Sequence, residues 1–319
     1  MLRSFLIYLS KAVWARKIVT HWGFAWKAAS RFVSGEKLED AIEVIRYLNK
    51  KGVNATLDHL GEHTDSPDAA RKATQDIMDA IDGIEQAGVQ ANVSIKLSQI
   101  GLTVNEQLCE ENLRLLLVHA RERGNFVRID MEDTPWTDKT LAIFRKMRAE
   151  GLTNTGIVIQ AYLYRSEDDL KKLMQEKSTI RLCKGAYMEP AELAFPRKKD
   201  VDANYDRLAE ILIDTSAENG FPEVSADGKL PPIPGIASHD PKRLAYAKQY
   251  AAQKGLPKKA LEFQMLHGIR RDLQDQVVQE GYPLRIYVPY GTEWYPYFMR
   301  RLAERPANLW FFVSNFFRK

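Results

Sequence analysis

Residues 156–183, GIVIQAYLYRSEDDLKKLMQEKSTIRLC, join two apolar runs through a polar loop and an amphipathic segment. Such runs predict parallel strands that are buried on both faces, and the segment between them predicts a connecting helix. We expect the strands at Gly156–Leu163 and Thr179–Cys183, and Ser166 and Asp169 have the spacing of a capping box at the start of the helix. The stretch therefore predicts one βαβ unit.

The same alternation recurs along the rest of the chain. The other strands are expected at Asn54–Leu60, Asn92–Leu97, Phe126–Met131, Gly235–His239, Leu261–Leu266 and Leu284–Val288. Helix starts are marked at Ser66-Pro67 and at Asp240-Pro241. Eight such units predict an α/β fold, a (βα)8 TIM-type barrel, with a doubly wound parallel sheet as the alternative.

Two segments lie outside this alternation. We divide the chain into N-terminal basic amphipathic helices at 1–50, a barrel domain at 51–308 and an aromatic tail at 309–319. A helix is expected at Glu36–Lys51. The stretch Gly220–Pro234, rich in Pro and Gly, predicts one long loop that is either mobile or a simple insertion.

Composition excludes several classes of protein. The 319 residues include 46 basic and 42 acidic side chains, a net charge of +4, which is too small to favour nucleic acid as a partner. The basic leader up to Ser34 contains no acidic residue, and its apolar run Phe5–Leu9 is too short for a signal peptide. No stretch approaches the roughly 18 apolar residues of a membrane span. The two cysteines provide no disulfide framework, and a reducing cytoplasm fits best.

Functional groups stand near the expected ends of nearly all the strands, where the active site of a βα barrel forms. They are Lys96, Asp130, Gln160, Arg181, Lys184, His239, Gln264 and Tyr287. Any one of them could be a polar residue that satisfies backbone groups at a strand terminus. Charges inside apolar strands are costly unless they are paired or bind a ligand, so their convergence favours a cavity with an anionic guest.

The expected last helix, Glu293–Arg305, places Tyr297, Arg300, Arg301 and Glu304 on one face. Adjacent arginines are planar, permanently charged forks that suit a small carboxylate, and Glu304 can hold one of them in its rotamer. A solvated face with salt bridges is the alternative. The nearby aromatic residues favour the carboxylate site.

Other cofactor signatures are missing. The chain contains neither G-x-G-x-x-G nor G-x-x-x-x-G-K-[ST]. The segment Asp58–His63 holds two histidines and two acids, but it spans a strand end and a loop without the helix that H-E-x-x-H requires. We expect no metal site.

Three motifs in order carry a family resemblance: RLCKGAY at 181–187, EFQMLHG at 262–268, and YVPYG at 287–291 followed by Tyr297-x-x-Arg300-Arg301-x-x-Glu304. Together they resemble monofunctional proline dehydrogenase, from about Lys51 to Asn308. The resemblance implies a distorted βα barrel with noncovalent FAD over the strand ends. It also implies oxidation of L-proline to Δ1-pyrroline-5-carboxylate by hydride transfer to flavin N5, the first step of proline catabolism to glutamate.

Carried over by position, the resemblance assigns roles to individual residues. Asp130 and Arg181 are the catalytic candidates, and Arg181 lies beside the reactive edge of the flavin. Lys96, Arg300 and Arg301 bind the proline carboxylate with support from Glu304, and Tyr287 and Tyr297 wall the ring. The flavin is lined by Met131, Gln160, Arg181, Lys184, Gly185, Ala186, Tyr187, Ser238, His239 and Gln264. Cys183 replaces a small apolar residue of the family, and we interpret it as packing.

The resemblance also implies partners. A quinone is the usual electron acceptor of the family, and a separate pyrroline-5-carboxylate dehydrogenase takes the product. The leader and the aromatic tail fit a bilayer surface, which would make the protein peripheral on the cytoplasmic face of the membrane. The other interpretation is that they pack on the barrel or cover an oligomer interface.

Two competing functions stay open at this point. A Schiff-base aldolase would use Lys96 or Lys184 at a strand end and would bind no flavin. A non-catalytic, membrane-associated scaffold would tolerate loss of Arg300 or Arg301.

Overall fold

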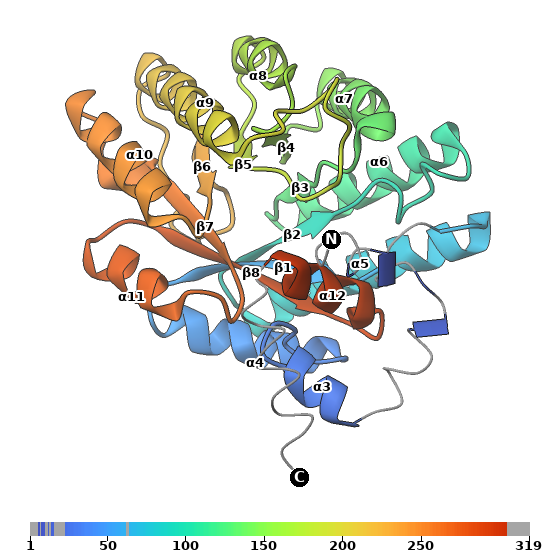
Figure 1. Ribbon diagram of the computed structural model, residues 1–319. Coiled ribbons are helices and arrows are strands. Elements are labelled where there is room, and N and C mark those ends of the chain that lie inside the picture. Colours follow the sequence, from blue (N-terminus) through green and yellow to red (C-terminus); the bar gives the residue numbers. More distant parts are fainter. Residues whose placement is uncertain are drawn as a thin grey trace.

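The computed structural model describes residues 6, 8, 9, 12, 14, 15, 23–61 and 64–304. Eight parallel strands close into a barrel in chain order, and the last strand pairs with the first. Helices surround this barrel on its outside (Figure 1). The predicted (βα)8 barrel is therefore confirmed, and the closed order of the strands excludes a doubly wound open sheet.

All eight predicted strands are present, with ends that differ from the prediction by a few residues. They are β1 (Asn54–His59), β2 (Ala91–Ile95), β3 (Val127–Ile129), β4 (Thr155–Gln160), β5 (Ile180–Cys183), β6 (Pro234–Ala237), β7 (Glu262–Leu266) and β8 (Leu284–Tyr290). Arg181, Gln264 and Tyr287 were expected at strand ends but lie inside their strands. Their side chains enter the barrel from within the sheet rather than from its rim.

The helices that follow β1 to β7 form the outer ring, whose apolar faces pack on the strands. They are α5 (Pro67–Ala87), α6 (Glu106–Glu122), α7 (Thr134–Ala149), α8 (Ser166–Gln175), α9 (Lys198–Glu218), α10 (Pro241–Gln253) and α11 (Arg271–Gln279). A short 3-10 helix, η1 (Lys258–Ala260), precedes β7.

The last helix, α12 (Trp294–Glu304), departs from this ring. It lies across β1 and β8 in Figure 1 and contributes three side chains to the cavity described below. The outer position between β1 and β8 is filled by α4 (Leu38–Asn49), the observed form of the helix predicted at Glu36–Lys51, which contacts both strands. A further helix, α3 (Gly23–Ala29), packs against α12. This exchange of helices is the distortion that the resemblance implied.

Two predicted helix starts are confirmed and one is wrong. The Ser66 hydroxyl accepts a hydrogen bond from the Ala69 N–H at 3.3 Å, and the Asp240 carboxylate accepts one from Lys242 at 3.1 Å. Ser166 caps nothing, because it is already the first residue of α8 and its hydroxyl donates to the Gln160 carbonyl at 2.5 Å. The Ser166 hydroxyl thus satisfies the last carbonyl of β4 instead of capping α8.

The long loop before β6 packs against the starts of the strands. The Asn92 side-chain amide donates to the Lys229 carbonyl at 2.9 Å, and Arg285 donates to the Gly228 carbonyl at 2.7 Å. Gly228 has φ +68, and a Cβ there would lie 2.2 Å from Asn54 Oδ1. The loop therefore closes the floor of the barrel, the end opposite the C-terminal ends of the strands.

No helix in the described part of the chain is long and apolar enough to cross a membrane. The tail at 309–319 lies outside the described residues, as do residues 1–5, 7, 10, 11, 13 and 16–22 of the basic leader.

The position of α4 gives a prediction about stability. Ile45 on this helix is fully buried, whereas Glu43 is exposed. We expect Ile45→Ala to lower the free energy of unfolding by about 2–5 kcal/mol and Glu43→Ala to change it by less than about 0.5 kcal/mol. Urea unfolding followed by circular dichroism measures both. Equal effects would show that α4 does not seal the seam between β1 and β8.

Candidate active site

Alternation along the strands turns charged side chains into the barrel interior. Arg181 on β5 bonds to residues of β2 and β7, which are not its neighbours in the sheet. Such contacts are possible only across the interior. Above them lies a cavity of about 670 Å³. Its walls include every residue that the sequence assigned to substrate, cofactor or catalysis and whose side chain the structure describes.

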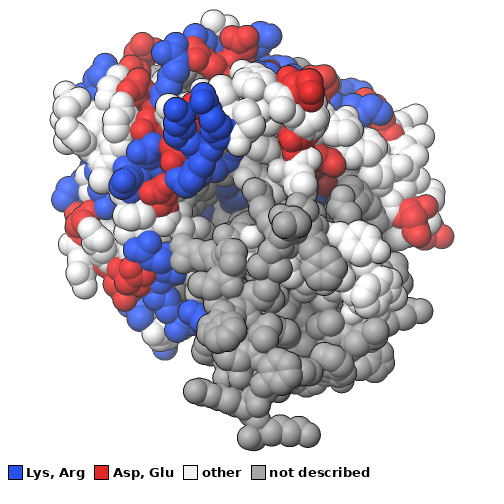
Figure 2. Space-filling view, in the orientation of Figure 1, with Lys and Arg blue, Asp and Glu red and all other residues white. Residues whose placement is uncertain are grey.

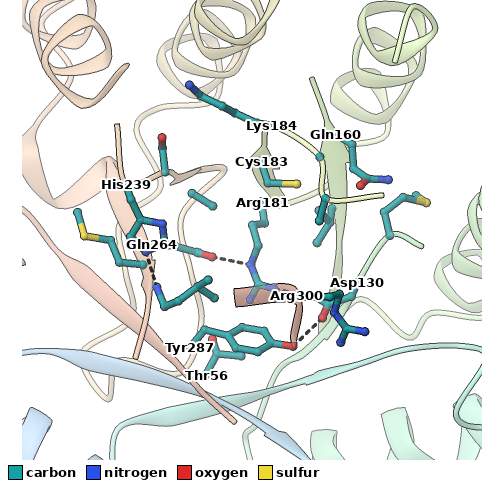
Figure 3. A pocket seen from close by; sticks show the side chains of 18 of the residues that line it. Thr56, Asp130, Gln160, Arg181, Cys183, Lys184, His239, Gln264, Tyr287 and Arg300 are labelled. Carbon is teal, nitrogen blue, oxygen red and sulfur yellow. Dashed lines mark hydrogen bonds and ion pairs between the residues drawn. The ribbon is translucent and has the colours of Figure 1, made fainter. Parts of the chain in front are cut away.

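Asp130, directly after β3, is the centre of this arrangement. Its Oδ1 accepts hydrogen bonds from Arg181 Nη1 and from the Ser94 hydroxyl, both at 2.7 Å. Its Oδ2 accepts one from the Tyr287 hydroxyl at 2.8 Å (Figure 3). The same oxygen lies 3.6 Å from Lys96 Nζ. One carboxylate thus orients groups from β2, β5 and β8.

These contacts determine the charge of Asp130. Burial alone would raise the pKa of its carboxyl, but Arg181, Lys96 and the two hydroxyl donors outweigh burial and hold the pKa below its ordinary value. Asp130 is therefore ionised at neutral pH.

Asp58, at the end of β1, is a site residue that the sequence assignment missed. Its Oδ1 lies 3.6 Å from Lys96 Nζ, and its side chain is 1% exposed. Burial raises the pKa of Asp58 despite the opposing charge of Lys96. Its place at a strand end was a usable signal, but the segment Asp58–His63 was weighed only as a metal site.

Lys96 stays a cation. Burial favours loss of its proton, but the carboxylates of Asp58 and Asp130 overcome burial and raise the pKa of the amine well above its ordinary value. A Schiff base forms from a neutral amine. The second candidate, Lys184, is occupied by carboxylates, as described below. The aldolase alternative is therefore disfavoured.

The helix α12 brings the predicted carboxylate-binding face to the same cavity. Tyr297, Arg300 and Arg301 line it, and the Arg301 guanidinium carbon lies 5.0 Å from the centre of the Tyr297 ring. Arg300 is close enough to Lys96 for its charge to oppose protonation of that amine. Three cations thus face one space. Glu304 ends α12, and its side chain lies outside the described part of the structure.

The expected cofactor positions line another part of the wall. Gln160 donates to the Glu132 carbonyl at 2.9 Å, and His239 Nε2 accepts the Leu266 N–H at 2.9 Å. The other positions on this wall are Met131, Gly185, Ala186, Tyr187, Ser238 and Gln264.

Lys184 differs from the expectation of a cation aimed at a cofactor. Its amine contacts Asp202 at 2.5 Å and Asp240 at 2.7 Å, and in Figure 3 its side chain points away from Arg181. Asp202 lies on α9 and Asp240 lies directly before α10. No pattern in the sequence indicated that these two acids would contact Lys184. Its role toward a cofactor stays a prediction.

Cys183 packs partly against the core, as interpreted from the sequence, and it also lines the cavity. Burial raises its pKa to about 12, so the side chain is a neutral thiol.

Among the residues that the structure describes, no group of three His, Cys, Asp or Glu side chains could hold a metal ion. His59 instead packs on the Tyr290 ring, with centroids 5.1 Å apart, and Glu62 and His63 lie outside the described residues.

The described residues on the face shown in Figure 2 carry no dominant charge. Basic and acidic side chains are interspersed over the described residues on the face shown in Figure 2. Inside the cavity the balance differs, because its described lining holds eight Lys or Arg side chains and three Asp side chains. Positive charge is thus concentrated where a ligand would bind.

The chain is similar to known proteins over most of its length. The family profile described as proline dehydrogenase matches residues 41–313. The chain is 37% identical to proline dehydrogenase 1 of Bacillus subtilis strain 168 over 319 residues, covering 100% of both chains. It is 41% identical to proline dehydrogenase of Deinococcus radiodurans over 294 residues, covering 91% of this chain and 90% of that one.

A solved structure is also similar: proline utilization A from Bdellovibrio bacteriovorus, inactivated by N-propargylglycine. The TM-score is 0.79 at 28% identity over 88% of this chain. This chain spans 33% of that one.

The central role of Asp130 predicts a loss of stability on substitution. Asp130→Asn leaves Arg181 buried without its countercharge, and we expect the free energy of unfolding to fall by about 3–5 kcal/mol at pH 7. The native pKa is depressed, so the stabilisation is present above the unfolded value of about 3.9 and is lost as the pH falls through the native pKa. The difference between the variant and the native protein should therefore shrink in acid.

The matched control is Asp138→Asn, which removes an ion pair with Arg165 from a carboxylate that is 80% exposed. It should change the free energy of unfolding by less than about 1 kcal/mol. If the two variants were equally stable across the pH range, Asp130 would not be the countercharge of Arg181.

Proposed function

The chain belongs to the proline dehydrogenase family, and from this premise we propose that it oxidises L-proline to Δ1-pyrroline-5-carboxylate, the first step of proline catabolism. The observation that carries the proposal is the convergence of Lys96, Arg300 and Arg301 on one cavity that is also walled by Tyr287 and Tyr297. A small carboxylate with an apolar ring matches this wall, because the cations suit the carboxylate and the two tyrosine rings suit the apolar ring.

The three cations would fix the carboxylate end of proline. A planar arginine fork can hold two carboxylate oxygens at once, and Lys96 adds a point charge from the end of β2. Because the pyrrolidine ring is rigid, holding one end leaves little freedom to its reacting carbon. Tyr287 is itself fixed by its bond to Asp130. Proline would thus bind between charges that are already in place.

The family is one of flavoenzymes, and we propose noncovalent FAD as the cofactor. The cavity volume of about 670 Å³ falls within the range of cofactor pockets, and the excess of cations suits a group that carries phosphates. The residues that would hold it are Met131, Gln160, Lys184, Gly185, Ala186, Tyr187, Ser238, His239 and Gln264. When bound, the flavin supplies the acceptor for the hydride that leaves proline.

The residues of the chain supply orientation and charge. Arg181 is held by Asp130, Ser94 and Gln264, so its positive charge is available at the cavity without reorganisation. We propose that it stabilises negative charge that develops on the acceptor. Asp130 keeps Arg181 and Tyr287 in place and remains ionised throughout.

We propose three partners. A separate pyrroline-5-carboxylate dehydrogenase would take the product, and a quinone would take the electrons. The barrel domain at 51–308 would carry catalysis. The third partner would be the cytoplasmic face of a membrane, which the basic leader up to Ser34 and the tail at 309–319 would contact while α4 stays packed on β1 and β8.

The first test is an anaerobic visible spectrum of the purified protein before and after addition of L-proline. We expect the flavin absorption band to bleach, because reduction removes it. A flavin band that proline leaves unchanged would retain the flavoenzyme and refute the substrate. A colourless protein that cannot be reconstituted with FAD would refute the cofactor and favour a non-catalytic scaffold.

The second test concerns the carboxylate site. Arg300→Met and Arg301→Met should each raise the KM for proline by about 10- to 100-fold, the equivalent of one charged hydrogen bond, while flavin stays bound. Arg165→Met is the matched control, because Arg165 pairs with Asp138 and Asp169 on the outer ring. Unchanged proline kinetics in both α12 variants would contradict the assignment.

A further inference from the structure

A column of polar side chains runs from the floor of the barrel to the cavity, and its lower half is used by none of the roles above. At its base, Arg285 on β8 and Glu262 on β7 form two hydrogen bonds of 2.9 Å. Their side chains are 1% and 0% exposed. A buried ion pair contributes little net stability over a well-packed apolar pair, so its presence here calls for another explanation.

The backbone of the barrel holds this pair in place. Arg285 also donates to the Ala55 carbonyl at 2.9 Å and to the Gly228 carbonyl in the floor loop at 2.7 Å. Its fork therefore has one fixed position. Since the fork binds both oxygens of Glu262, the carboxylate is fixed as well.

Glu262 in turn determines which way the side-chain amide of Gln264 points. Gln264 Nε2 donates to Glu262 Oε1 at 2.7 Å, and Gln264 Oε1 accepts from Arg181 Nε at 2.6 Å. In the opposite orientation the amide oxygen of Gln264 would face the Glu262 carboxylate, and two acceptors would repel each other. The NH2 group of Gln264 would face the Arg181 guanidinium, and neither of these two donors would have an acceptor. Only the observed orientation satisfies both neighbours.

The sheet leaves room for this column at one glycine. Gly235 on β6 pairs in register with both Arg181 and Glu262. A Cβ on Gly235 would lie 2.8 Å from Gln264 Nε2. The gap between Arg181 and Glu262 is thus open only because β6 has no side chain there, and the amide of Gln264 fills it.

We propose that Glu262 is a positioning residue for the oxidation of proline: through the amide of Gln264 it fixes the Arg181 guanidinium at the cavity. The chain of contacts is Arg285, Glu262, Gln264, Arg181 and Asp130, and only its upper members reach the reacting groups. The inference rests on the proposed function for its kinetic test and on geometry alone for its spectroscopic test.

The kinetic test is a double-mutant cycle on holoenzyme. Glu262→Gln keeps the shape but offers Gln264 a group that accepts either orientation, so we expect kcat to fall about tenfold with the KM for proline within twofold. In the Gln264→Met background the same change should alter kcat by less than twofold. An equal fall in both backgrounds, or no fall in the native background, would overturn the inference.

The spectroscopic test is the Nε–H resonance of Arg181 in a 15N-labelled protein, assigned by its disappearance in Arg181→Lys. It should shift or broaden in Glu262→Gln. It should be unchanged in Arg165→Lys, because Arg165 lies on the outer ring and pairs with Asp138 and Asp169. A resonance unmoved in Glu262→Gln would refute the positioning role.

The two tests separate the possible failures. If native enzyme is not reduced by proline, the proposed function fails, and the resonance of Arg181 still decides the role of Glu262. If Glu262→Gln does not fold, Arg285→Lys replaces it in both tests, because it keeps both charges but removes the fork that fixes Glu262. The same changes in kcat and in the resonance are expected.

Discussion

The structure depends on one constraint: charged side chains inside the barrel are shielded from water, so each needs a hydrogen-bond or ion-pair partner within the protein. Most βα barrels fill this space with branched apolar side chains. Here the interior instead holds the buried charged residues Arg128, Arg285, Glu262 and Arg181, with the partly buried Asp130 beside them. Asp130 accepts from groups of three strands, and its removal would leave the buried Arg181 without a countercharge. The interior is thus both the core of the fold and the base of the active site.

The exchange of helices around β1 and β8 follows from the need to close the cavity above this interior. The helix α12 brings Arg300 and Arg301 over the cavity and therefore cannot cover the outer side of the seam. The seam is closed by α4, whose residues Ala41, Ile42, Ile45 and Leu48 are buried. At the other end the loop before β6 covers the floor, and its Gly228 carbonyl receives the Arg285 guanidinium. Neither covering is one of the barrel's strands or outer helices: α4 precedes the first strand, and the loop is the connection between α9 and β6.

The sequence predicted what depends on local pattern. Apolar runs located all eight strands because strands buried on both faces leave a strong signal, and helical spacing placed Tyr297, Arg300 and Arg301 on one face. It failed where a side chain is used by a distant segment. Ser166 bonds to the end of β4 instead of capping α8, and Lys184 meets carboxylates from α9 and from the segment before α10. Asp58 and Glu262 lie in stretches that the sequence singled out for other reasons, and only the closed barrel shows what their side chains contact.

Preorganisation explains why so many acids accompany the cations of the site. A cavity lined by cations alone would repel its own side chains, and they would turn toward water. Asp58 and Asp130 keep Lys96 charged and in place, and Asp130 with Gln264 does the same for Arg181. The lining still has more positive than negative side chains, so an anion would bind to cations whose positions are already fixed. The acids therefore lower the attraction for an anion somewhat but remove the reorganisation that binding and chemistry would otherwise require.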